Sequence, residues 1–108
     1  TFHKHAGTLC QGLQIHVDHP GYQPTNFRPW RLICLAFKAL RELQPEYPLW
    51  RDFAYEYEFD RLAIDLINGS PLLREWVDDP QAVPEDLDAL ARADERLWLE
   101  ARRRFLLY

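Results

Sequence analysis

The stretch Cys10 to Asp18 reads CQGLQIHVD, and it decides the fold that the sequence predicts. Apolar and polar residues alternate strictly along it, as Leu13, Gln14, Ile15, His16, Val17 and Asp18. Such alternation is typical of a β-strand, because successive side chains of a strand point to opposite faces. We therefore expect a strand over 10–18 with an apolar face on a core and a polar face that is free to hold a ligand.

A second alternating stretch, DFAYEYEF over 52–59, favours another strand, with a helix as the alternative. Its aromatic residues fall on one side, whereas Glu56 and Glu58 fall on the other and suit a solvated face. The two ends of the chain, 1–6 and 105–108, are candidates for further short strands. Together these segments predict a small sheet.

Four helices complete the predicted fold, near 29–43, 60–68, 70–77 and 84–104. Their apolar residues recur every three or four positions, as on one face of a helix. The expected caps and stops are Thr25 or Asn26, Asp60, Ser70 before Pro71, and Gly69 as a left-handed stop. The fold class that follows is α+β, a small sheet packed against about four helices.

Length and charge narrow the possible functions. The 108 residues suit one domain over 1–108, and a hydrophobic share of 47% suits a packed globular chain. The net charge of -4 offers no general attraction for nucleic acid, and the basic run Arg102 to Arg104 fits a helix end. No apolar run approaches the roughly 20 residues that span a bilayer, so we expect neither nucleic acid nor a membrane span.

The amino end indicates a longer protein. The chain contains no Met and begins with Thr1 and Phe2 in what reads as mid-strand sequence. We therefore expect this domain to be cut from a longer protein, with any targeting signal upstream.

A metal site is one hypothesis for the first nineteen residues. Their potential ligands are His3, His5, Cys10, His16, Asp18 and His19. The spacing matches no standard zinc pattern, so we expect no metal and no cofactor. The two cysteines, Cys10 and Cys34, are expected to be free thiols, although a bridge between them stays open at this level.

Catalysis by this chain has little support from the sequence. A carboxylate pair could come from Glu56, Glu58, Asp60 and Asp65. A solvated strand face and a helix cap explain the same residues. Nothing marks Cys10 as a nucleophile activated by His16. We therefore assign no catalytic residue here.

The polar face of the first strand is the stronger hypothesis. Gln14, His16 and Asp18 lie next to His5, and Tyr55 or Tyr57 faces them in the predicted fold. Amides and carboxylates hydrogen-bond sugar hydroxyls, and an aromatic ring stacks on the apolar side of a sugar. The alternative is an ordinary solvent-exposed face.

Several dispersed motifs occur in an order that resembles a known family. They are Phe2-x-Lys4-His5-x-Gly7, Cys10-x-Gly12-Leu13-Gln14-Ile15-His16-Val17-x-His19, Tyr57-Glu58-Phe59-Asp60, Asp65-Leu66-Ile67-x-Gly69 and Arg104-Phe105-Leu106-Leu107-Tyr108. The chain resembles the carboxy-terminal domain of the bacterial exo-β-N-acetylmuramidases. The resemblance spans essentially the whole chain but only the last third of such a protein.

The resemblance implies a function. The parent would be a glycoside hydrolase that removes terminal N-acetylmuramic acid from peptidoglycan fragments, with its main catalytic groups in an upstream Rossmann-like domain. This chain would be an accessory domain that closes one side of the cleft and is inactive alone, and the parent would be exported. The resemblance places the substrate-binding residues at His5, Gln14, His16, Tyr57 and Asp60.

Two further points follow from the resemblance. Pro20-Gly21 and the proline-rich loop after them depart from the family pattern and leave the shape of that loop open. The alternative function is a stand-alone module that binds carbohydrate or a protein without catalysis.

Overall fold

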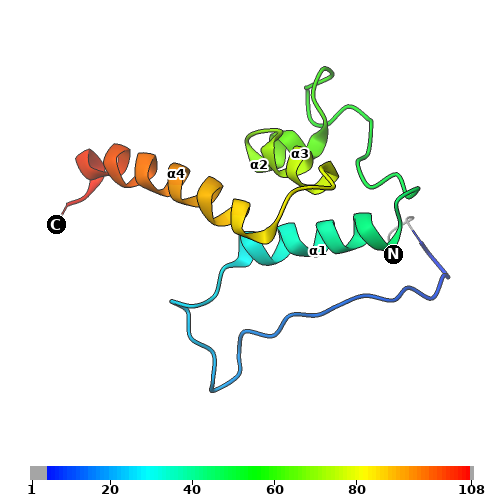
Figure 1. Ribbon diagram of the computed structural model, residues 1–108, viewed down its shortest axis with the longest axis horizontal. Coiled ribbons are helices and arrows are strands. Elements are labelled where there is room, and N and C mark those ends of the chain that lie inside the picture. The colour runs from blue at the N-terminus through cyan, green and yellow to red at the C-terminus, as the bar shows by residue number, and fades with distance from the viewer. Residues whose placement is uncertain (1–4, 108) are drawn as a thin grey trace.

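The computed structural model describes residues 5–107, and this part of the chain is helical (Figure 1). Its elements are α1 (Pro29–Leu43), α2 (Ala63–Asn68), α3 (Leu72–Asp78), α4 (Pro84–Arg102) and the 3₁₀ helix η1 (Arg103–Phe105). α1 packs against α3 and against α4, and α2 packs against α3. The second half of α4 extends away from this group (Figure 1). Within residues 5–107, every helix is too short or too polar to traverse a bilayer.

The predicted α+β class is wrong, because residues 5–107 contain no β-strand. The segment 10–18 is irregular, and none of its backbone groups bonds to another backbone group of the described chain. Its Leu13 side chain is 94% exposed. A strand needs a neighbour that pairs its N–H and C=O groups, and among residues 5–107 no second strand lies beside this segment. Alternation alone therefore did not produce a sheet.

The predicted strand over 52–59 is also wrong, because the chain turns back on itself there. Tyr55 and Glu58 exchange backbone hydrogen bonds of 3.2 and 3.0 Å in one isolated bridge. Between them Glu56 adopts a positive φ of 55°, which reverses the chain and interrupts the alternation. Arg61 donates to the Glu58 carboxylate at 2.6 Å, and this hydrogen bond lowers the pKa of the Glu58 carboxyl.

The two ends do not add strands in the described part of the chain. Phe105 closes η1, and Leu106 and Leu107 are irregular. His5 and the next residue lie in a turn. The remainder of the predicted end strands, residues 1–4 and 108, lies outside the described residues.

The helices were predicted in the right places, while most of their caps were not. Pro29 and Pro84 begin helices as expected, and Gly69 ends α2 with φ of 83° in the left-handed region that favours glycine. The cap position of α1 is Arg28, not Thr25 or Asn26, and it makes no side-chain cap hydrogen bond. α2 begins after Leu62 rather than at Asp60, and Pro71 rather than Ser70 occupies the cap position of α3.

The buried core is small. Five hydrophobic side chains make it up: Cys34, Leu73, Trp76, Val77 and Leu87. The radius of gyration is 17.2 Å, whereas a compact domain of this length has about 13 Å. The described chain therefore buries few side chains for its length and leaves many apolar ones exposed.

Lys38 of α1 is buried against the end of α3. Its Nζ donates hydrogen bonds to the carbonyl oxygens of Trp76 (3.4 Å), Val77 (3.2 Å) and Asp79. The ammonium also lies 5.4 Å from the centre of the Trp76 ring. The last carbonyls of a helix have no partner within the helix and carry partial negative charge, so the Lys38 ammonium adds a cap to the carboxyl end of α3.

Both cysteines are free in the structure, with Cys10 exposed and Cys34 buried. Burial raises the pKa of the Cys34 thiol to about 11. Cys34 therefore stays protonated and shielded at neutral pH, whereas Cys10 is accessible.

Replacing Lys38 with Met should destabilise the chain by about 1–3 kcal/mol, because buried carbonyls at the end of α3 lose their donor. Urea unfolding followed by circular dichroism measures the change. Arg96→Met, on an exposed part of α4, is the control and should stay within about 0.5 kcal/mol of the unchanged protein. Equal effects of the two substitutions would contradict the role of Lys38.

Thiol labelling at pH 8 with an aromatic disulfide reagent should modify one cysteine quickly. Cys10 is the expected target, since only about one in a thousand Cys34 thiols is ionised when the pKa is about 11. The second equivalent should react only after unfolding in guanidinium. Cys10→Ser should abolish the fast phase, and two equally fast equivalents would show that Cys34 is not buried.

Candidate functional site

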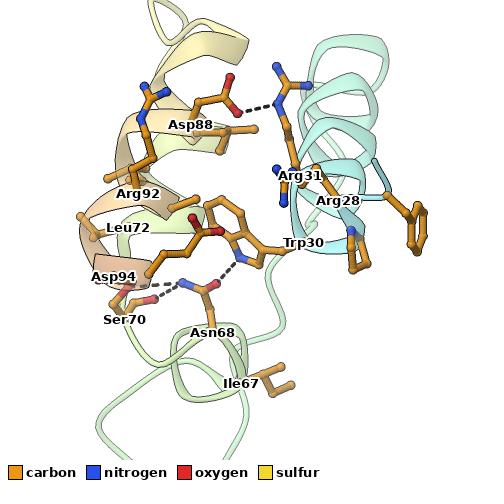
Figure 2. Close-up of a pocket in the computed structure, with 16 residues that line it drawn as sticks. Arg28, Trp30, Arg31, Ile67, Asn68, Ser70, Leu72, Asp88, Arg92 and Asp94 are labelled. Atoms are coloured by element: carbon orange, nitrogen blue, oxygen red, sulfur yellow. Dashed lines mark hydrogen bonds and ion pairs between the residues drawn. The ribbon is translucent and has the colours of Figure 1, made fainter. Parts of the chain in front are cut away.

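A groove of about 770 Å³ lies between the start of α1, the connection from α2 to α3, and the first half of α4. Figure 2 shows its side chains converging from these elements. A volume of this size is typical of sites for small ligands. The groove is therefore the candidate site within the described chain.

Trp30 is the aromatic wall of the groove, and its orientation is held by hydrogen bonds. The indole Nε1–H donates to Asn68 Oδ1 at 2.9 Å. The Asn68 amide in turn donates to the Ser70 carbonyl at 3.1 Å and to the Ser70 hydroxyl at 3.3 Å (Figure 2). Trp30 remains 37% exposed, so part of this fixed aromatic side chain is accessible to a ligand.

Local sequence explains why Asn68 reaches Trp30. Asn68 is the last residue of α2, and Gly69 follows it in the left-handed conformation. This reversal places Ser70 beside the Asn68 amide. Pro29 starts α1 and puts Trp30 in its first turn.

An ion pair joins the two long helices at the groove. Arg31 Nε lies 3.0 Å from Asp88 Oδ1, and a terminal nitrogen of Arg31 donates to the carbonyl of Pro84 at 3.4 Å. The two charged side chains are 32% and 46% exposed, so the pair contributes modestly to stability. Its main effect is to orient α1 against the start of α4.

The remaining charged groups of the groove balance in number. Arg28 and Arg92 are basic, and Asp94 and Glu95 are acidic. None of these four forms an ion pair with another residue of the described chain. The groove thus combines an aromatic ring, an amide, a hydroxyl and charges of both signs, which suits a polar ligand with both hydroxyl groups and a charge.

The site residues predicted from the sequence lie elsewhere. His5 occupies a turn with φ of 58°, and Gln14 and His16 are exposed on the irregular segment. His16 Nδ1 lies 3.6 Å from a carboxylate oxygen of Asp18.

Tyr57 and Asp60 belong to the loop before α2. Tyr57 is 92% exposed, and the backbone N–H of Asp60 donates to a Glu58 carboxylate oxygen at 3.1 Å. Figure 1 shows this green loop and the blue segment 10–18 on opposite sides of α1. The structure therefore does not bring Tyr57 or Asp60 to Gln14 and His16, and none of the five predicted residues lines the groove.

The sequence reading missed Trp30, Arg31 and Asn68 as site residues. The three- and four-residue spacing over 29–43 assigns Trp30 to the apolar core-facing stripe and Arg31 to the opposite, solvated face of the same helix. The sequence around Gly69 is the one signal that points toward this site. It predicts the chain reversal after Asn68, but it does not show that Asn68 bonds to Trp30. Among residues 5–107, no three His, Cys, Asp or Glu side chains gather in a way that could hold a metal ion, and His3 lies outside this range.

Comparison with known proteins gives one match. The family model described as exo-beta-N-acetylmuramidase NamZ, C-terminal, matches residues 1–108, the whole chain. No curated protein and no solved structure matches the chain.

Proposed function

The chain belongs to the family of C-terminal domains of the exo-β-N-acetylmuramidase NamZ, and from this premise we propose that it is the accessory domain of a peptidoglycan-degrading glycoside hydrolase. In this proposal it forms one side of the substrate cleft and has no activity alone. The observation that carries the proposal is the family match over all 108 residues. Recognition of the same family from dispersed motifs of the sequence is confirmed by that match.

The proposed partner is an upstream Rossmann-like catalytic domain of the same protein. Residues 1–108 would then be the last domain of a longer chain. The small core and the exposed apolar side chains support this arrangement, because a domain that closes against another leaves such surface uncovered when viewed alone. The proposed substrate is a saccharide that contains muramic acid. We further propose that the protein is exported, as the resemblance to the family implies.

His5, Gln14 and His16 are the residues proposed to contact the saccharide, whereas Tyr57 and Asp60, which lie apart from Gln14 and His16 in this chain (Figure 1), are proposed to contact another part of it. Imidazole and amide groups hydrogen-bond hydroxyls, and a tyrosine ring packs on a sugar face. The exposure of Gln14 and His16 supports the proposal, because an upstream domain could hold a sugar against them.

A second candidate function is a stand-alone module that binds carbohydrate or a protein. The groove beside Trp30 favours it, because that groove is formed entirely by this chain. The two functions differ in whether the parent enzyme needs this domain for turnover.

Turnover of a chromogenic N-acetylmuramic acid glycoside should require both domains. The full-length protein should release the sugar, residues 1–108 alone should release none, and the upstream part alone should lose about 100-fold or more in kcat/KM, because the cleft loses one positioning wall. Turnover by residues 1–108 alone would end the accessory-domain proposal. Full activity of the upstream part, with saccharide binding by residues 1–108, would favour the stand-alone module.

Substituting His16 with Ala in the full-length protein should raise KM for the same glycoside by about 5–10-fold, the loss expected for one hydrogen bond to the substrate. The far-ultraviolet circular dichroism of residues 1–108 should not change, because His16 lies on an exposed irregular segment. His19→Ala is the control, because it also removes an imidazole but from a residue outside the proposed site. Unchanged kinetics of the His16 variant would make His16 an ordinary solvent-exposed residue.

A further inference from the structure

The groove contains groups whose arrangement the fold alone does not require. Trp30 is held in place through Asn68 and Ser70 while part of its ring stays open. The hydrogen bond joins the start of α1 to the end of α2, while part of the Trp30 side chain is left uncovered. A fixed, half-open aromatic ring is what a saccharide site uses, since sugar rings pack on it without further loss of side-chain entropy.

Two guanidinium groups of the groove favour a ligand that carries a carboxylate. Arg28 comes from the start of α1 and Arg92 from α4, so they reach the groove from its two opposite walls (Figure 2). Arg31, the third arginine of the groove, is already paired with Asp88. Arg28 and Arg92 form no ion pair within the described chain, and a guanidinium binds a carboxylate through two parallel hydrogen bonds.

The acidic groups of the groove limit what the ligand can be. Asp94 and Glu95 would repel a simple anion, but their oxygens accept hydrogen bonds from hydroxyl or amide N–H groups. A plain carboxylate therefore fits the groove poorly. A sugar that carries one carboxylate fits better, because it can present hydroxyls to these oxygens and its acid to an arginine.

We propose that the groove between α1 and α4 binds a carboxylate-bearing saccharide, with the sugar ring on Trp30 and the carboxylate on Arg28 or Arg92. This site is separate from the residues proposed above to form the cleft, and its relevance to peptidoglycan rests on the proposed function. Two sources can supply the acid in such fragments. One is the lactyl carboxylate of free muramic acid. The other is a carboxylate of the attached peptide, since in a muropeptide the lactyl carboxyl is tied up in the first amide bond.

Nuclear magnetic resonance of the 108-residue chain can test the site directly. The chain has four tryptophans, so its indole N–H region contains few signals, and Trp30→Phe identifies that of Trp30. Three probes are titrated: N-acetylmuramic acid, a muropeptide, and neutral N-acetylglucosamine. We expect the Trp30 signal to shift saturably with at least one acidic probe, and which of them binds identifies the source of the carboxylate. The neutral sugar should bind about tenfold more weakly, the loss expected for one charged contact.

Substitutions separate binding from folding. Trp30→Ala should abolish the shifts of neighbouring backbone signals, and Arg28→Gln or Arg92→Gln should weaken the acidic probe about tenfold without changing the fold, because both side chains are exposed. Trp98→Phe is the matched control, since Trp98 is 63% exposed on α4 and does not line the groove. It should bind as the unchanged chain does.

Three results would overturn the inference. They are an unmoved Trp30 signal with both acids, equal affinity for the neutral sugar, and unchanged affinity in both arginine variants. The turnover comparison of full-length and shortened protein does not depend on Trp30. A failure here, with turnover still requiring both domains, would remove only the groove site and leave the accessory function in place.

Discussion

The burial of the Lys38 ammonium between α1 and α3 is the constraint on which the remaining structure depends. A charge removed from water costs several kcal/mol unless polar partners replace the lost hydration. The replacement comes from the carbonyls of Trp76, Val77 and Asp79, which are available only because α3 ends there. The length of α3 and its position along α1 are therefore coupled. A shift by one turn would remove Lys38 from the buried carbonyls of Trp76 and Val77 and leave its charge buried without them.

The groove follows from that arrangement. The Trp76 indole donates to the carbonyl of Val83 at 3.1 Å, so the end of α3 also positions the residue before α4. Leu87, one turn later, is fully buried in the same core. Arg31 and Asp88 then align the start of α1 with the first turns of α4. The opening beside Trp30 is thus formed by helices whose directions are determined by the core, and a ligand there would meet a largely prepared surface.

The parts of the fold that could be predicted from the sequence are those with local causes. Pro29 begins a helix and Gly69 ends one because their backbone preferences act within a single turn. The segment 10–18 has equally clear alternation, but a strand depends on a partner that no local pattern supplies. The groove could not be predicted from the sequence for a similar reason. Trp30 and Asn68 are 38 residues apart, and their hydrogen bond exists only after α1, α2 and α3 have packed.

Compactness bears on the choice between an accessory domain and a stand-alone module. A module that folds and binds alone must gain enough from burial to offset the conformational entropy of ordering the chain. Here the buried core comprises five side chains, while Leu13 and Leu107 are 94% and 95% exposed at opposite ends of the described chain. A second domain against these surfaces would remove apolar area from water at about 25 cal/mol per Å² and stabilise the chain in proportion. An accessory domain therefore accounts for both the exposed apolar residues and the match to a family of C-terminal domains. A stand-alone module accounts only for the groove.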